Sequence, residues 1–132
     1  MRIKFVSAAG LAALLAAAAA LPAAAQDLEN GAEVFKKCRA CHQIGESAKN
    51  AVGPVLNGLF GRKSGTIEGF SYSDANKSSG VTWDDATFAK YIADPKAFMP
   101  GNKMAFAGVK DPEDIKDLTA FIKQFDATGK KK

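Results

Sequence analysis

The chain has 132 residues with 18 basic and 14 acidic side chains, a formal net charge of +4. Hydrophobic residues make up 47% of it and charged residues 24%, a composition that fits one globular domain and excludes a disordered or fibrous chain. The basic excess is small, and two of the basic residues, Arg2 and Lys4, stand at the very start, so nothing indicates nucleic-acid binding.

Residues 1–25 have the pattern of a cleaved secretory signal peptide. A positively charged start leads into an apolar run rich in Ala and Leu, which closes with three alanines that end at Ala25. An uncleaved membrane anchor is the alternative, because the apolar run is nearly long enough to span a bilayer. No spacer separates the run from the amphipathic segment at Asp27, and this favours cleavage after Ala25. We therefore expect an exported, periplasmic protein in which residues 26–132 form a single domain.

The first element after this segment is predicted to be a helix from Asp27 to Cys38. Leu28, Ala32 and Phe35 recur at helical spacing, and the first residue of the segment is a suitable N-cap. Gly31 lies inside this helix, where glycine costs about 1 kcal/mol relative to alanine. We therefore expect a second helix to approach Gly31 closely.

The segment 44–79 is rich in glycine and shows no long hydrophobic period. Hydrophobic residues are scattered through it, so it is predicted to be a folded loop rather than a linker, and loops of this length are usually functional. A short helix from Asp74 to Ser79, closed by Gly80, is predicted at its end.

Two longer helices are predicted in the second half of the chain. One starts at Thr82 as its N-cap and ends at Asp94, because the residue before a proline avoids the helical region. The proline opens a short helical turn to Met99. The last helix has Asp111 as its N-cap and Pro112 at its first position. No segment alternates like a strand, so the sequence predicts an all-α domain with long loops.

The strongest chemical signal is the motif Cys38-x-x-Cys41-His42, which contains both cysteines and the only histidine of the chain. This spacing is typical of c-type haem attachment, in which two sulfurs form thioethers with the porphyrin and the adjacent imidazole reaches the iron. A structural zinc ion would need four ligands, and a thioredoxin-like site would follow a strand. A plain disulfide stays possible but leaves the adjoining His42 unexplained.

The second iron ligand has to come from elsewhere in the chain. No other histidine exists, and Met1 would leave with the signal peptide, so Met99 and Met104 are the candidates. Met104 lies in an irregular loop that can aim a side chain inward, whereas Met99 ends a helical turn and could simply fill the core. A thioether ligand raises the haem potential.

Further motifs resemble the class I cytochrome c family, especially the bacterial cytochromes c2 and mitochondrial cytochrome c. These motifs are Phe35, Gly53-Pro54, residues 59–65, 69–72 and 74–77, Thr82-Trp83, Tyr91, Pro95 and the Met104 loop. The resemblance covers essentially the whole of residues 26–132. It implies a small cytochrome c fold, in which the N- and C-terminal helices cross and long loops wrap a covalently bound haem. Gly31 and Phe35 would then meet the last helix near Leu118 and Phe121.

The resemblance also implies roles for individual residues. One haem c would be attached through Cys38 and Cys41, with His42 and Met104 as the axial ligands, and Pro54 would accept a hydrogen bond from the histidine. The other haem contacts that it implies are Arg62, Tyr72 and Trp83 near the propionates, and Asn76, Tyr91 and Asn102 on the methionine side.

Two of these residues have simpler interpretations when the resemblance is set aside. Trp83 could be a core aromatic that needs only some partner for its N–H, and Arg62 could be a surface residue of a glycine-rich turn. The chain also departs from the family pattern, since Asn102 stands where many relatives carry Thr and Phe70 where they often carry Tyr.

The function that the resemblance implies is that of a soluble periplasmic one-electron carrier, not an enzyme. It would shuttle electrons from a cytochrome bc1-type donor to a terminal oxidase or a photosynthetic reaction centre, as a monomer without stable membrane insertion. Acidic partners would dock near the exposed haem edge, at lysines expected to surround it: Lys37, Lys96, Lys103 and Lys110. A haem peroxidase or small-ligand binder would need an open iron position, and Met104 argues against one.

Overall fold

Five α-helices joined by long loops make up the part of the chain that the structure describes, Gly10 and residues 26–132. The structure is a computed structural model. The helices are α1 (Leu28–Phe35), α2 (Asp74–Ser78), α3 (Asp85–Ala93), α4 (Pro95–Phe98) and α5 (Pro112–Lys123). Two isolated β-bridges, and no strand, accompany them in these residues, so the predicted all-α class is confirmed.

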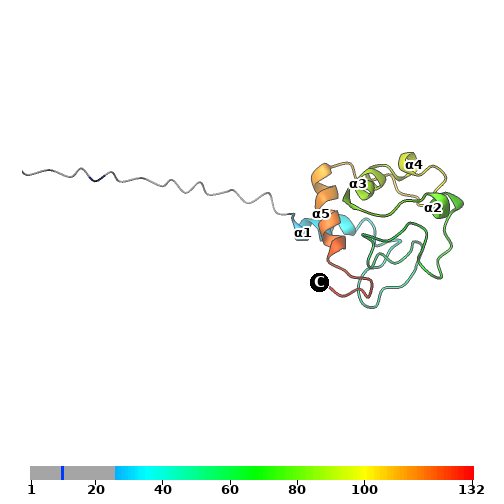
Figure 1. Cartoon of the computed structure of the whole chain (residues 1–132), viewed down its shortest axis with the longest axis horizontal. Coiled ribbons are helices and arrows are strands. Elements are labelled where there is room, and N and C mark those ends of the chain that lie inside the picture. The colour runs from blue at the N-terminus through cyan, green and yellow to red at the C-terminus, as the bar shows by residue number, and fades with distance from the viewer. Residues whose placement is uncertain (1–9, 11–25) are drawn as a thin grey trace, which may run out of the picture.

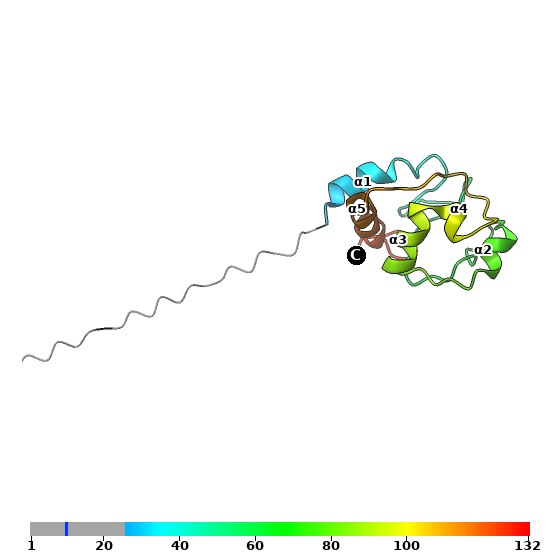
Figure 2. The same ribbon diagram turned by 90° about the horizontal axis from the view of Figure 1, so that it is seen from above.

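The predicted signal peptide lies outside the described residues except for Gly10, and its cleavage stays a prediction. No helix in the described part of the chain is long and apolar enough to cross a membrane. Figures 1 and 2 show α1 and α5 side by side at the end of the domain where residue 26 lies, with α2 at the other end and the loops between them.

The crossing of α1 and α5 forms the most tightly packed part of the fold. A Cβ atom added to Gly31 would lie 2.8 Å from Cβ of Phe121 and would also overlap the backbone of Asp117, so only glycine fits there. The rings of Phe35 and Phe121 pack with centroids 5.2 Å apart, and Leu118 is fully buried. The close approach predicted at Gly31 is therefore confirmed.

A polar lock that the sequence did not reveal fastens the start of α1 to α5. The buried carboxylate of Asp117 accepts the backbone N–H of Asp27 at 2.8 Å and the side-chain amide of Asn30 at 2.9 Å. The same amide donates to Asp114 at 3.0 Å. The hydrogen bonds from Asn30 and Asp27 lower the pKa of Asp117, so the carboxylate stays ionised and able to accept them at neutral pH.

The first helix ends earlier than predicted, at Phe35 rather than Cys38. The backbone N–H groups of Lys36, Lys37 and Cys38 bond to carbonyls three residues back, at 3.2, 3.1 and 2.8 Å, which is the tighter 3₁₀ pattern. The chain then turns through the C-x-x-C-H motif, where the N–H of His42 bonds to the carbonyl of Cys38 at 2.9 Å. The motif thus lies on a tight turn beyond the helix.

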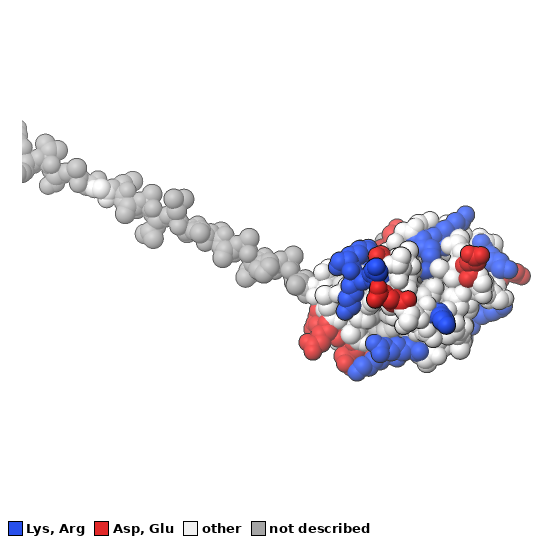
Figure 3. All heavy atoms as spheres, turned by 90° about the horizontal axis from the view of Figure 1, so that it is seen from below, with Lys and Arg blue, Asp and Glu red and all other residues white. Residues whose placement is uncertain are grey.

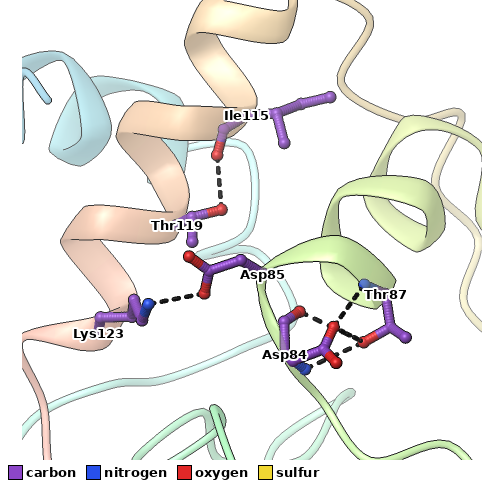
Figure 4. A network of polar contacts seen from close by, with 6 residues as sticks. All are labelled: Asp84, Asp85, Thr87, Ile115, Thr119 and Lys123. Carbon is purple, nitrogen blue, oxygen red and sulfur yellow. Dashed lines mark hydrogen bonds and ion pairs between the residues drawn. The ribbon is translucent and has the colours of Figure 1, made fainter. Parts of the chain in front are cut away.

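The start of α3 was also predicted wrongly, because its N-cap is Asp84 and not Thr82. Asp84 accepts the N–H of Thr87 at 2.7 Å, and the hydroxyl of Thr87 accepts the N–H of Asp84 at 3.0 Å, which is a reciprocal capping box. Thr82 instead forms an antiparallel bridge with Lys63. Figure 4 shows this cap beside the exposed ion pair between Asp85 and Lys123, which joins α3 to α5 at 2.6 Å.

The remaining helix signals agree closely with the structure. Helix α2 ends at Ser78, one residue before the predicted end, and Gly80 follows it with a φ of 68°. Pro95 opens α4, which ends at Phe98 with Met99 as its C-cap. Asp111 caps α5 and Pro112 occupies its first turn, both as predicted.

Candidate cofactor site

A cavity of about 400 Å³ lies between the helices and the long loops. It is lined by all eleven residues to which the resemblance gave a role in binding the haem or its iron: Cys38, Cys41, His42, Pro54, Arg62, Tyr72, Asn76, Trp83, Tyr91, Asn102 and Met104. Much of the remaining wall is apolar, with the aliphatic and aromatic side chains Leu56, Leu59, Phe70, Phe88, Ile92 and Phe106. Residues from separate parts of the sequence thus meet around one largely apolar space.

The imidazole of His42 is held in one tautomer by its neighbours. Its Nδ1 lies 2.7 Å from the carbonyl oxygen of Pro54, and because a carbonyl can only accept, Nδ1 carries the proton and Nε2 keeps its lone pair. Burial lowers the pKa of His42, which favours the neutral ring that binds metals. A Cβ atom on Gly53 would lie 2.7 Å from Nδ1, so the backbone of Gly53 packs directly on the ring.

The two cysteines are unpaired and half-buried on the cavity wall. Burial, followed by the nearby sulfur of Cys41, raises the pKa of Cys38 to about 11. In the described residues no strand precedes the motif, as one would in a thioredoxin-like dithiol site. No group of three or more His, Cys, Asp or Glu side chains lies together in the described residues, which leaves a zinc ion without a ligand set there.

The structure places the two candidate methionines in different surroundings. Met99 is 4% exposed and packs within the hydrophobic core, and it is not part of the cavity wall. Met104 lines the cavity, and the hydroxyl of Tyr91 donates to its Sδ at 3.5 Å. Burial raises the pKa of Tyr91 to about 12, so this hydroxyl keeps its proton at neutral pH. Met104, and not Met99, can present a thioether to a group in the cavity.

The polar residues on the cavity wall are anchored through their own hydrogen bonds. Arg62 donates through one guanidinium nitrogen to the carbonyls of Val55 and Asn57, each at 3.1 Å; burial lowers its pKa, but a guanidinium stays charged at neutral pH. The oxygen of Tyr72 accepts the N–H of Ile67 at 3.0 Å, which leaves its own proton free to donate. These groups can therefore hold a negatively charged substituent in place.

Two more wall residues are fixed by the loops. Trp83 is held in an extended segment by backbone bonds to Arg62 and Gly61, at 3.0 and 2.7 Å, and its ring centroid lies 4.9 Å from that of Tyr91. Asn76 accepts the hydroxyl of Ser64 at 2.5 Å, so its amide N–H groups are the part left to face the cavity. Trp83 belongs to the hydrophobic core cluster, and both Trp83 and Arg62 line the cavity.

The four lysines predicted to surround the haem edge differ in their contacts. Lys37 and Lys103 line the cavity, whereas Lys96 and Lys110 do not. The ammonium group of Lys110 donates to the carbonyl of Ala93, the last residue of α3, so this lysine is engaged within the fold. Figure 3 shows one face of the molecule on which acidic side chains lie among the basic ones, so that face is not uniformly positive.

The site also contains residues that the sequence did not single out. Gly53 was quoted only as part of a motif, yet its missing side chain makes room for the His42 ring. Phe88 and Ile92 belong to the buried, apolar face of α3, and they line the cavity. Their helical spacing was the available signal, but spacing alone cannot tell a core from a cofactor pocket.

The residues of this site fit a haem group attached through sulfur. A large apolar wall, two thiols beside a neutral imidazole, a thioether from another segment and donors for carboxylates together match what a c-type haem requires. The fit rests on the donor set and on the tautomer of His42, which leaves Nε2 as its only nitrogen available to a metal.

Comparisons with known proteins agree with this assignment. The family model described as cytochrome c matches residues 28–126. The chain is 66% identical over 116 residues to a protein named cytochrome c2 from Blastochloris viridis, covering 88% of this chain and 91% of that one. It is 63% identical over 107 residues to a cytochrome c2 from Rhodoplanes tepidamans, covering 81% of this chain and 100% of that one.

Solved structures give the same result for the fold. The structure of cytochrome c2 from Rhodospirillum centenum matches with a TM-score of 0.72 and 38% identity, over 76% of this chain and 98% of that one. The structure of cytochrome cH from Methylobacterium extorquens matches with a TM-score of 0.69 and 44% identity, over 74% of this chain and 97% of that one.

Proposed function

Because the chain belongs to the cytochrome c family, we propose that it is a soluble periplasmic one-electron carrier whose haem iron is bound by His42 and Met104. Members of this family carry one covalently attached haem c, and this chain is an electron-transfer protein and not an enzyme. Both of these predictions from the sequence are thereby confirmed. The ligands, the location and the partners form the proposal.

The observation that carries the proposal is the place of Met104 on the wall of the same cavity as His42. Haem supplies an iron that can change its charge by one electron. The protein would have to supply both remaining ligands of the iron, so that no position is open to a substrate and the same ligands stay bound in both charge states. The Nε2 lone pair of His42 and the thioether of Met104, steadied by the Tyr91 hydroxyl, are suited to this.

The proposed location rests on the signal-like pattern of residues 1–25. Cleavage after Ala25 would leave Gln26 as the first residue of the exported protein. Mass spectrometry of the protein purified from the periplasm would give the mass of residues 26–132 with one haem. A mass that includes residues 1–25 would contradict cleavage.

The proposed partners are acidic redox proteins: a cytochrome bc1-type complex as donor, and a terminal oxidase or a reaction centre as acceptor. Lys37 and Lys103 line the cavity, and with Lys96 they are the lysines that we assign to docking. Lys110 has a smaller role in this proposal than the sequence suggested, because its ammonium group is bonded to Ala93. Docking that depends on these lysines should weaken as salt is added.

Exposure of the reduced holoprotein to carbon monoxide tests the closed iron site that the function requires. We expect little binding at neutral pH, because Met104 occupies the position that carbon monoxide would take. Acid–acetone extraction should leave the haem on the chain, since the bonds through Cys38 and Cys41 are covalent. Rapid binding of carbon monoxide by protein with covalent haem would contradict the carrier function and favour a ligand sensor or an enzyme.

A further inference from the structure

The loop that carries Met104 is fastened through one side chain, that of Asn102. The Nδ2 of Asn102 donates to the carbonyl oxygens of Pro95 and Met99, at 2.9 and 2.8 Å. Its Oδ1 accepts the backbone N–H of Met104 at 2.8 Å. These partners fix the orientation of the carboxamide. If it were flipped, its oxygen would face two carbonyl oxygens and its NH₂ group would face the N–H of Met104, so none of the three bonds could form.

Few other bonds hold this stretch of the chain. The backbone of residues 100–108 donates only two hydrogen bonds to backbone carbonyls, from Asn102 to Met99 at 3.2 Å and from Phe106 to Met104 at 3.1 Å. The next such bond comes from Val109, which donates to the last turn of α3. Without the Asn102 side chain, the N–H of Met104 would have no partner in the protein.

The three bonds join two features that are otherwise separate. The bond from Oδ1 to the N–H two residues on forms an Asx-turn, which fixes the backbone where the Met104 side chain starts. The two bonds from Nδ2 go to the carbonyls of Pro95, the first residue of the short helix α4, and of Met99, its C-cap. They add to the backbone bonds that these two carbonyls already accept. Because the Tyr91 hydroxyl contacts the sulfur at 3.5 Å, the side chain is held at both of its ends.

We propose that Asn102 is the positioning residue for Met104, and that its carboxamide keeps the thioether in place against the iron by tying the ligand loop to α4. This rests on the proposed function, in which Met104 is the iron ligand. A serine or threonine hydroxyl has a single proton to donate, so it cannot bond two carbonyls and accept the Met104 N–H as the carboxamide does. The departure at Asn102 from the threonine common in relatives thus has a specific consequence in this chain.

The experiment measures how fast imidazole binds the oxidised holoprotein, since imidazole binds only when the methionine side opens. We expect Asn102→Ala to speed binding about tenfold or more, because the closed loop loses more than one net hydrogen bond. Asn102→Ser keeps a possible acceptor for the Met104 N–H and should lie between Asn102→Ala and the wild type. In the reduced ¹⁵N-labelled protein, the Met104 amide should exchange faster in both variants.

Asn57→Ala is the matched control, because the Asn57 carboxamide also makes two backbone bonds, to the N–H and carbonyl of Gly45 at 2.9 and 2.8 Å. It should lower the denaturation midpoint and leave imidazole binding within about twofold of wild type, since Gly45 lies on the histidine side of the chain. Equal acceleration in Asn57→Ala and Asn102→Ala would show a general loss of stability and overturn the inference.

The charge-transfer band and the rate of imidazole binding together distinguish a failure of this inference from a failure of the proposed function. If wild-type protein lacks the thioether–iron charge-transfer band, Met104 is not the ligand and both proposals fall. If the band is present and Asn102→Ala binds imidazole no faster than wild type, only the positioning role is wrong. Should Asn102→Ala not fold with haem, the Asn102→Ser variant decides in the same way.

Discussion

The histidine side and the methionine side of the cavity are built by different means. Around His42 the chain is fixed by backbone bonds, such as those from His42 to Cys38 at 2.9 Å and from Gly53 to Cys41 at 2.7 Å. Around Met104 the backbone makes few bonds, and the side chains of Asn102 and Tyr91 take their place.

This difference separates two tasks of the site. A backbone framework tolerates changes in most of its side chains, so the attachment side should keep its geometry under substitution. A loop that depends on two side chains can be altered by a single change. With Met104 as the proposed iron ligand, the methionine side would be the part where the properties of the iron can be adjusted, while the attachment side stays constant.

The largest effect is expected when attachment itself is removed, because then neither side has a group to enclose. In Cys38→Ser, Cys41→Ser the cavity of about 400 Å³ would have to stay empty or fill with water. Because much of this wall is apolar, leaving it without the haem should remove a large part of the stability of a small domain. Far-UV circular dichroism should show a largely unfolded chain. A helical spectrum for the haem-free variant would mean that the backbone framework folds without the cofactor.

A smaller effect is expected from crowding the histidine side with Gly53→Ala. The new Cβ would lie 2.7 Å from Nδ1 of His42, so the ring or the loop has to shift, at about 1–3 kcal/mol. Denaturant unfolding of the holoprotein measures the loss. The nearby Ala51→Ser is the control, since Ala51 is exposed and does not line the cavity, and it should change stability by less than about 0.5 kcal/mol. Equal stability of Gly53→Ala and wild type would mean that the attachment side is not rigid.

The smallest effect, and one that acid pH should remove, is expected at the lock between α1 and α5, which touches neither side of the cavity. The pKa of Asp117 is lowered in the folded protein, so its contribution to stability is present above the pKa of the unfolded chain. That contribution is lost as the pH falls through the lowered folded pKa. Asp117→Asn should therefore destabilise at neutral pH, and its difference from wild type should shrink as the solution is acidified below about pH 4.

Thermal unfolding across this pH range checks the prediction. Asn30→Ala removes the main cause of the lowered pKa and should reduce the same pH dependence, whereas the haem spectrum should not change in either variant. A constant offset between Asp117→Asn and wild type at every pH would show that Asp117 acts through packing and not through its charge.

The sequence predicted most of the features that depend on local chemistry. Asp111 followed by Pro112 predicted the start of α5. The C-x-x-C-H motif predicted the attachment side of the cavity, and Gly31 predicted a helix crossing. Each of these is decided by residues close together in the chain, so a local pattern is enough.

The features that were missed or predicted wrongly depend on distant contacts. Thr82 has a suitable side chain for an N-cap, but it forms a β-bridge with Lys63. Its backbone therefore stays extended, and the helix begins after Asp84, which is the N-cap. The residues alone left both Met99 and Met104 as candidate iron ligands. The two differ in their surroundings, because Met104 lines the cavity whereas Met99 is buried in the core. The role of Asn102 could not be predicted, because it depends on hydrogen bonds between the Met104 loop and α4 that only the folded structure shows.

The most direct test of the central claim compares Met104→Leu with Met99→Leu in the purified holoprotein. The account predicts that Met104→Leu abolishes the thioether–iron charge-transfer band of the oxidised protein and lowers the reduction potential, because the soft ligand that favours ferrous iron is gone. Met99→Leu conserves the volume of a core residue and should do neither. Loss of the band in Met99→Leu, or its survival in Met104→Leu, would contradict the account.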